Sequence, residues 1–247
     1  MNSQYEVNYQ SHHEGAASLD YQDMDLAGQD LRGLDLRGAN LSGANLERAD
    51  LRDANLTRAN LSQSILERAD LRGAILIRAN LSGASLISAD LKGANFTRAN
   101  MSDTLLDQAQ MMDTIFKDAL LTRSSLWQTM LTRANLSRAN LSEANLEGSV
   151  MIGVNLWLAI LSRANLRKTN LTGASLVACD LSESILVDAD LTGANFSRAN
   201  MAGADLGNLT LNETNFSRVI LSCANVRMVK FDDAKMTKAV MPDGGTY

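Results

Sequence analysis

The sequence lacks the features that would place the chain in a membrane or direct it out of the cell. No apolar run approaches the roughly 20 residues that a transmembrane helix needs, although 45% of the 247 residues are hydrophobic. Residues 1–18 are polar and lack the basic, apolar and small-residue regions of a secretory signal. We therefore expect a soluble cytoplasmic protein that does not associate with membranes.

Residues that often carry enzyme chemistry are equally scarce. The only two histidines, His12 and His13, are adjacent, with no Cys or acidic partners at metal-ligand spacing. The sequence contains no Ser/His/Asp or Cys/His set and no glycine-rich phosphate loop. It therefore predicts no catalytic residues, no cofactor, no metal site and a protein that is not an enzyme.

A five-residue repeat dominates what is present. A large apolar residue stands at every fifth position from residue 26 to residue 241, which makes 44 positions without a change of register. It is Leu at 32 of them, and the residue two places earlier is Ala at 27. A large and a small inward residue separated by a polar one is strand geometry, and the other two residues must turn a corner. Such a chain coils, and its coils stack as a solenoid.

The number of repeats in one coil follows from residues that recur every 20 positions. Phe96 and Phe116 are 20 apart, as are Phe196 and Phe216, and the residue after the large one is Ser or Thr at this spacing from residue 42 to residue 182. We therefore predict four pentapeptides per coil and about 11 coils. With strands about 4.8 Å apart, the rod would be roughly 50 Å long.

The repeats also carry a family resemblance. Segments such as ADL, ANL and ANF, each followed by two polar residues, resemble the pentapeptide-repeat family over about residues 20–241. This resemblance implies an all-β fold, a right-handed quadrilateral parallel β-helix. The ending AVMPDG at residues 239–244 resembles the GA-x-MPDG tails of cyanobacterial members. The family includes topoisomerase-protecting DNA mimics and cyanobacterial developmental regulators, so the resemblance implies a fold rather than one function.

The repeat sets the expected domain organisation. We predict a single β-helix domain over residues 19–241, between a flexible tail at 1–18 and a C-terminal tail at 242–247. The small inward positions of the first coil hold larger side chains, namely Leu19, Met24, Gln29 and Leu34. Side chains of this size would clash between two coils, but they can cover the open end of the solenoid. We therefore expect residues 19–36 to form an N-terminal cap.

The register of the repeat also predicts the positions of the two cysteines and of three lysines. Cys179 takes a small inward position and Cys223 an outward one, so their separation should exceed the ~7 Å limit for a disulfide, and both should be free thiols in a reducing compartment. Lys230, Lys235 and Lys238 stand in the final turns. Lysines there would discourage strand addition at an exposed edge.

Charged side chains form two kinds of series at a spacing of 20 residues. In the first, an acidic and a basic series stand two residues apart and can neutralise each other as a paired, solvated face. Its members are Asp30, Asp50, Asp70 and Asp90 with Arg32, Arg52, Arg72 and Lys92. The second is a candidate basic stripe along one corner, comprising Arg58, Arg78, Arg98, Arg138, Arg198 and Arg218. Because Asp118, Leu158 and Ala178 interrupt it, the stripe is either a solvated face or a site for an acidic partner or a polyanion.

Outward positions that are polar elsewhere become apolar in the middle coils. The candidate partner-binding residues among them are Met112, Trp127, Met130, Val150, Ile152, Trp157 and Leu158. On a four-sided coil the two Met, Val150 and Ile152 share one face, Trp127 lies near one of its edges and Trp157 lies beyond the other. Exposed apolar surface with Trp and Met is typical of a partner-binding site. Scattered β-favouring residues on a strand are the alternative.

Two non-enzymatic functions remain for such a rod. We favour a protein-binding scaffold with a regulatory role that binds a partner protein, of unknown identity, through outward side chains of the middle coils. The alternative is a DNA mimic that protects or inhibits a type II topoisomerase such as gyrase. A mimic needs a predominantly acidic surface, whereas 28 acidic and 23 basic residues give a net charge of −5. We expect no direct binding of nucleic acid.

The two ends of the chain differ in charge. Residues 1–30 contain six acidic residues and no Lys or Arg, while residues 227–240 contain four basic and two acidic ones. This polarity predicts a monomer or a weak end-to-end dimer whose association depends on salt.

Overall fold

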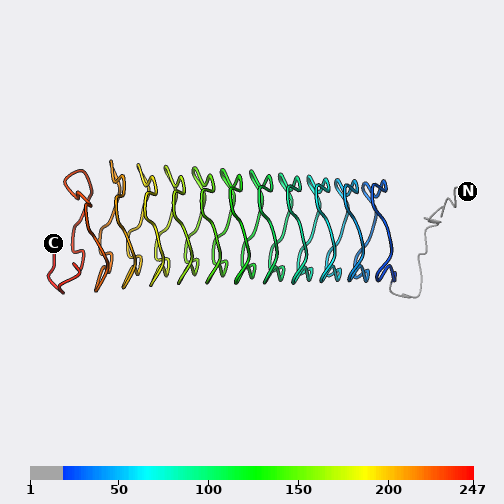
Figure 1. Cartoon of the computed structure of the whole chain (residues 1–247), viewed down its shortest axis with the longest axis horizontal. Helices are drawn as coiled ribbons and strands as arrows, with labels where there is room; N and C mark the ends of the chain where they lie inside the picture. Colours follow the sequence, from blue (N-terminus) through cyan, green and yellow to red (C-terminus); the bar gives the residue numbers. More distant parts are fainter. Residues whose placement is uncertain (1–18) are drawn as a thin grey trace, which may run out of the picture.

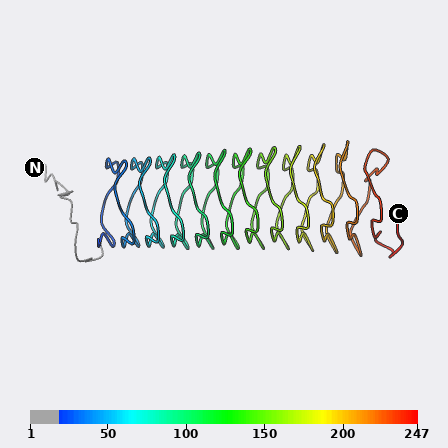
Figure 2. The ribbon, with the colours of Figure 1, turned by 180° about the vertical axis from the view of Figure 1, so that it is seen from behind.

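The computed structural model describes residues 19–247, which form a straight rod of stacked coils (Figure 1). The first described coil lies at one end of the rod and the C-terminus at the other, and the stack is equally regular when seen from behind (Figure 2). No residue of this part of the chain is helical, and each strand is reduced to a single bridging residue. None of it therefore has the length and apolarity of a membrane-crossing helix.

Parallel bridges join residues 20 apart and confirm four pentapeptides per coil. Each coil is square, and we name its four faces by the ladders that run along them: face A from Asp20 to Val240, face B from Asp25 to Asn225, face C from Asp30 to Thr210, and face D from Asp35 to Lys235. Face A holds eleven consecutive bridges, in agreement with the predicted length. The fold is the right-handed quadrilateral β-helix that the family resemblance implied, with the four-sided coil that the repeat predicted. Each corner is named by the two faces that it joins.

Every regular corner is a tight turn with a left-handed residue. The amide of Ala39 donates to the carbonyl of Leu36 (3.1 Å), and the same bond recurs along the rod. The second corner residue has φ between +53° and +69° from Asp23 to Met228, which is the geometry of a type II turn. Many of these residues are not glycine, and a left-handed residue with a Cβ costs about 1–2 kcal/mol by itself. Bonds between coils hold them, as from the Arg58 amide to the Ile77 carbonyl (2.9 Å).

The interior is filled as the alternation predicts. Leu136 and Ala139, in the middle of the stack, are fully buried. The predicted phenylalanine pairs stack one coil apart, since the ring centroids are 5.1 Å apart in both Phe96–Phe116 and Phe196–Phe216. Where Ser or Thr takes the small inward position, its hydroxyl commonly donates to a backbone carbonyl, as Ser64 does to Leu61 (2.7 Å). A polar side chain of this size is therefore tolerated in the core.

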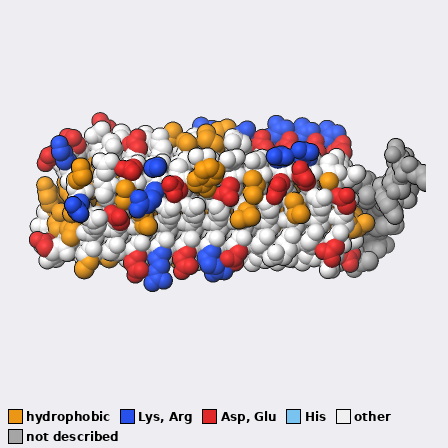
Figure 3. Space-filling view, viewed as in Figure 1, with side chains coloured by type: hydrophobic (Ala, Val, Ile, Leu, Met, Phe, Trp, Pro, Cys, Tyr) orange, Lys and Arg blue, Asp and Glu red, His pale blue; other side chains and the backbone are white. Residues whose placement is uncertain are grey.

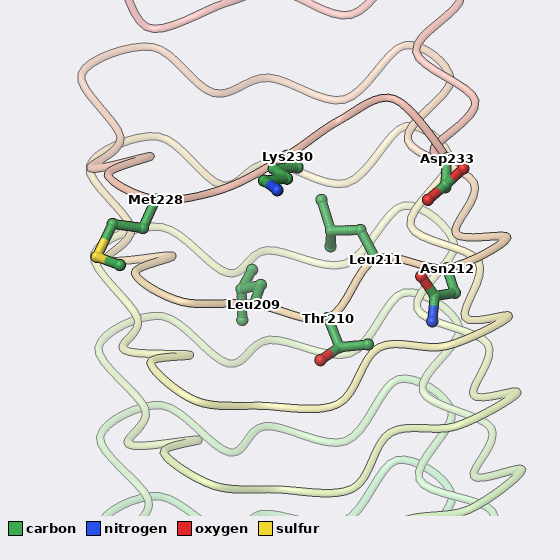
Figure 4. A pocket seen from close by; sticks show the side chains of 7 residues that line it. All are labelled: Leu209, Thr210, Leu211, Asn212, Met228, Lys230 and Asp233. Carbon is green, nitrogen blue, oxygen red and sulfur yellow. The ribbon is translucent and has the colours of Figure 1, made fainter.

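The ladder opens once, on face C of the last coil. Lys230 makes no bridge to Thr210, whereas Thr210 still bridges Asp190. The small inward position here holds Leu209 instead of Ala, with Val229 one coil later. A leucine in the space of a methyl group between two coils favours displacement of its neighbours, and the following segment arches away from the Leu209–Asn212 strand (Figure 4). The gap has a volume of about 250 Å³.

The two ends of the rod contain several residues for which the sequence predicted a tail or a cap. The proposed tail at residues 1–18, with His12 and His13, lies outside the described residues. Of the predicted cap side chains, Leu19 and Met24 are exposed and Leu34 packs against the core. The C-terminal tail folds back, because Thr246 pairs antiparallel with Val240 and the Tyr247 amide donates to the Ala239 carbonyl (2.9 Å).

Candidate partner-binding surfaces

One apolar surface lies on face C at mid-length. Met130 and Val150 are neighbours in the ladder of this face, between Gln110 and Asn170. We define the face-C zone as Met112, Trp127, Met130, Val150 and Ile152. Trp127 occupies corner BC and is 38% exposed, Ile152 occupies corner CD and is 40% exposed, and the other three are half-buried. The zone therefore spans one face and both of its edges, and apolar side chains gather at mid-length in Figure 3.

The backbone of Trp127 is held by an acidic residue of the preceding coil. Its amide donates to Oδ1 of Asp107 (3.0 Å), and the hydroxyl of Ser125 donates to the same oxygen (2.5 Å). In four other coils the corresponding amide of corner BC is bound by an Asn two residues earlier, as the Arg167 amide is by Asn165 (3.2 Å). Here Ser125 replaces that Asn, so Asp107 fixes the corner that presents the indole.

A second apolar surface lies at corner DA, diagonally opposite corner BC. We define the corner-DA zone as Trp157, Leu158, Ile160 and Val177. The first three are 45%, 41% and 40% exposed, and the Leu158 amide donates to the Val177 carbonyl of the next coil (3.1 Å). Because the two tryptophans occupy opposite corners, one flat partner surface cannot contact both. Val177 was not among the predicted candidates, since its position becomes informative only beside Trp157 in the stack.

Three exposed apolar residues of faces B and D do not cluster in the same way. Ile65, Leu105 and Ile75 stand singly in the ladders of faces B and D, each between polar bridge partners. Isolated β-branched and aliphatic residues on a strand are expected from strand propensity. The alternative explanation, that outward apolar residues only favour strand formation, therefore fits these three positions. They supply matched controls for the two zones.

The acidic and basic series on face C form the paired surface that was predicted. Arg32 binds Asp30 of its own coil (2.5 Å) and approaches Asp50 of the next (3.5 Å), and the same arrangement repeats as far as Lys92. The hydrogen bond from the Arg32 guanidinium lowers the pKa of Asp30 to about 2, and a bond from Arg52 lowers the pKa of Asp50. This half of face C is neutralised internally.

Charges of alternating sign occupy corner AB of the middle coils. Arg123 binds Asp103 (2.7 Å), and Arg163 lies between Glu143 (3.9 Å) and Glu183 (2.9 Å). Figure 3 shows acidic and basic side chains alternating along one long edge of the rod. The charges at corner AB therefore also offset one another and form no surface of a single sign.

The basic stripe occupies corner DA and differs from the other charged rows. Arg138 binds Asp118 (2.7 Å), which Arg98 approaches from the other side (3.8 Å). Four further stripe residues form no ion pair within residues 19–247: Arg58, Arg78, Arg198 and Arg218. The stripe is thus a row of exposed, largely uncompensated positive charge, and the corner-DA zone lies within it.

The remaining features of residues 19–247 are the gap on face C and the two cysteines. Within the described residues, no group of three His, Cys, Asp or Glu side chains could hold a metal ion. The gap on face C is lined by apolar and polar side chains together: Leu209, Leu211 and Met228 with Thr210, Asn212, Lys230 and Asp233 (Figure 4). Cys179 and Cys223 are both free, as predicted. Burial raises the pKa of Cys179 to about 12, and its Sγ donates to the Leu156 carbonyl (2.7 Å), so this thiol stays protonated.

Comparison with known proteins identifies the repeats and their structural relatives. The family model described as pentapeptide repeats matches in eight copies, over residues 23–58, 54–93, 64–103, 89–128, 119–157, 159–198 and 199–237. Among solved structures, HetL is described as a pentapeptide repeat protein involved in heterocyst differentiation regulation from the cyanobacterium Nostoc sp. Strain PCC 7120. It is 27% identical, with a TM-score of 0.55, and the match covers 93% of this chain and 92% of HetL.

Two further structures are more distant. A trypsin-treated variant of QnrB1, a plasmid-mediated fluoroquinolone resistance protein, is 16% identical over 90% of each chain, with a TM-score of 0.40. Rfr23 from the cyanobacterium Cyanothece 51142 is 27% identical over 53% of this chain and 89% of its own, with a TM-score of 0.25. No curated protein sequence gives a significant match.

Proposed function

The chain belongs to the pentapeptide-repeat family, and we propose that it is a rigid, non-enzymatic scaffold that binds a partner protein and regulates it. The proposal places this role in the cytoplasm, where free Cys179 and Cys223 would remain reduced. The likeness to HetL, which is described as involved in regulation, supports a regulator of the cyanobacterial type. The protein would act as a monomer or as a weak end-to-end dimer.

The observation that carries the proposal is the face-C zone. Met130 and Val150 interrupt a ladder that is acidic on its N-terminal side, and Trp127 and Ile152 extend the apolar surface over both edges. The backbone under these side chains is held by bonds to both neighbouring coils, as from the Met130 amide to the Ala109 carbonyl (3.1 Å). A preorganised apolar surface loses little entropy when a partner binds. Trp and Met are typical of the centre of such interfaces.

The test replaces Val150 and Ile152 by Thr. Threonine is also β-branched, so the strand should be kept, while apolar contact area worth about 25 cal/mol per Å² is removed. Proteins captured from a lysate of the native cell are identified by mass spectrometry for the wild type and the variant. We expect the Thr double variant to fold normally and to lose the specific partner.

The matched control makes the same substitution at isolated positions, Ile65→Thr and Ile75→Thr. This control should retain the partner. If both double variants capture the same proteins as the wild type, the face-C zone is not the binding surface. Circular dichroism and thermal unfolding of each variant separate a lost surface from a lost fold.

The charge arrangement argues against a topoisomerase-directed DNA mimic. Asp30 and its equivalents are paired with Arg or Lys, and Arg123 and Arg163 alternate with acids, so the described surface presents no continuous acidic stripe. A DNA-supercoiling assay with gyrase distinguishes the two functions. We expect no effect of the protein, whereas inhibition or protection that disappears when the four face-C aspartates become Asn would favour the mimic.

A further inference from the structure

We propose that corner DA is a second docking surface, which binds an acidic segment of a partner protein. The corner-DA zone would receive an apolar side chain of the segment, and Arg198 and Arg218 would bind its carboxylates. This surface lies diagonally opposite the face-C zone, so the inference goes beyond the proposed function and does not depend on it.

Uncompensated charge is the first observation. Stacked side chains of like charge stand about 5 Å apart and repel each other, and the other long charged series in the described chain offset this with acids. Within residues 19–247, Arg198 and Arg218 have no such partner. Lys238 continues the same corner in the next coil, where its backbone amide donates to the Tyr247 carbonyl (3.1 Å). Two consecutive coils of this corner therefore carry an arginine that forms no ion pair with a described residue. An acidic ligand would supply the counter-charge.

The polar neighbours of these cations carry no negative charge close by. Ser197 and Ser217 precede Arg198 and Arg218, and Asn200 follows on face A. The amide group of Asn200 already donates to Asp180 (3.0 Å), which engages the nearest acid of that face. A carboxylate arriving at the corner would therefore meet guanidinium groups and hydroxyls, with which it forms charge-assisted hydrogen bonds.

The exposure of Leu158 is the second observation. Leu158 is 41% exposed, in a row where the equivalent residues are mostly arginine. Its φ of +56° is shared by every regular corner and does not distinguish it. The exposed part of a leucine gains no hydrophobic stabilisation until it is covered. A partner that covers Leu158 together with Trp157 would provide that burial.

The distances suit a short protein segment. Leu158 and Arg198 are two coils apart, and Leu158 and Lys238 are four coils apart, which is about 19 Å at the strand spacing of a β-sheet. An extended segment of roughly six residues or an amphipathic helix of roughly 13 would span the row. Trp and Arg together are the residues that most often dominate binding energy in protein interfaces.

A nucleic acid fits this corner less well. Binding of a single strand uses aromatic side chains along the whole groove, whereas the coils between Trp157 and Tyr247, which pairs with Lys238, expose no aromatic residue in the described chain. The positive row is also one residue wide and is interrupted by Asp118, and neighbouring corners carry acids. The chemistry therefore favours a partner in which a few carboxylates flank an apolar residue.

Fluorescence anisotropy with a labelled peptide tests the inference. The probe is a synthetic peptide with a central Leu–Leu pair flanked by glutamates on both sides, titrated with the full chain at low salt. Its Gln-for-Glu analogue and a labelled oligothymidine of similar length serve as comparison ligands. We expect the acidic peptide to bind, its analogue to bind at least about tenfold more weakly, and the oligothymidine to bind more weakly than the peptide.

Four variants locate the site. Arg198→Gln/Arg218→Gln and Leu158→Asn should each weaken peptide binding about tenfold. Asn tolerates the left-handed conformation, so Leu158→Asn should fold. The charge-matched control Arg48→Gln/Arg68→Gln, at corner BC, should bind like the wild type. So should Val150→Thr/Ile152→Thr, which separates this inference from the proposed function.

Three results would overturn the inference. The first is the absence of peptide binding by the wild type, and the second is an equal loss in the corner-DA and corner-BC charge variants, which would indicate general electrostatic attraction. The third is tighter binding of the oligothymidine, which would identify corner DA as a nucleic-acid surface. Thermal unfolding confirms that each variant is folded.

Discussion

The stacked coils and the last coil are built from the same repeat, yet only the stacked coils keep every face of the ladder closed. In the stack, Ala139 fills the small inward position, and its carbonyl accepts a hydrogen bond from Ile160 of the next coil (3.0 Å). In the last two coils Leu209 and Val229 take that position, and the corresponding bond from Lys230 to Leu209 is absent from the described backbone. The closed and the open ladder therefore coincide with inward side chains that differ by three carbon atoms, although Leu34 in the first coil still accepts its bond from Asn55 (2.9 Å).

The two regions also differ in charge pairing. Every ion pair within residues 19–247 lies between Asp30 and Glu183, and the last coil has none. The stacked coils are thus held by the core, by the ladder and by surface pairs, whereas the end depends on fewer interactions of each kind.

Removal of a large core side chain should have the greatest effect. Leu136→Ala should lower the free energy of unfolding by about 2–5 kcal/mol, because it leaves a cavity among close-packed neighbours. Leu211→Ala should cost less, since Leu211 already borders the gap on face C. Chemical denaturation measures both values. Equal costs would mean that the gap does not exist in solution.

Changing the size of the small inward residue should open the ladder in the stack and close it in the last coil. Ala139→Leu should destabilise the middle of the stack by about 1–3 kcal/mol through overpacking, and it should accelerate hydrogen exchange at the Ile160 amide. Leu209→Ala should instead allow the last coil to close and slow exchange at Lys230. Both sites can be followed in one exchange experiment. Unchanged protection at both amides would show that side-chain size at this position does not control the ladder.

Acid should affect the charge-paired coils and spare the last coil. The pKa of Asp30 is lowered from 3.8 to about 2 by its bond to Arg32, and the pKa of Asp50 is lowered by its bond to Arg52. A carboxylate with a lower pKa in the folded state contributes stability that is complete above its unfolded value. That contribution is lost as the pH falls from about 4 to about 2.

Local hydrogen exchange as a function of pH measures this effect. Protection around Asp50 should fall in this range, and Asp50→Asn/Arg52→Gln should be less sensitive to acid there. Exchange in residues 226–240 should change less. A uniform loss of protection along the rod would contradict a local origin in the ion pairs.

Thiol chemistry provides the smallest perturbation. Cys223 is exposed at a corner near the open end, while Cys179 is buried in the stack with a pKa raised to about 12. Iodoacetamide at mildly alkaline pH should therefore alkylate Cys223 quickly and Cys179 only after unfolding. Peptide mass spectrometry distinguishes the two. Rapid modification of Cys179 in the folded protein would show that the coils open locally in the middle of the stack.

Much of the surface arrangement could be predicted because the repeat has a single register. A residue number alone places Arg58 and Arg218 in one corner row and Met130 beside Val150, since neighbours in a ladder are 20 positions apart. The division of the apolar residues into two opposite zones follows from the same arithmetic. The binding roles of the face-C zone and of the basic stripe remain predictions, because a row of side chains does not specify its ligand.

The sequence by itself determined the inward and outward positions, the coil of four repeats and the stacking of Phe96 on Phe116, because these depend only on periodicity. The tertiary structure decided which charges are paired, as Arg138 binds Asp118 while Arg58 binds no described acid. It also decided where the ladder opens. Ion pairing depends on the reach and rotamer of each side chain, and the opening depends on whether Leu209 fits beneath the next coil. Both are set by the space between particular neighbours, which a repeat pattern does not contain.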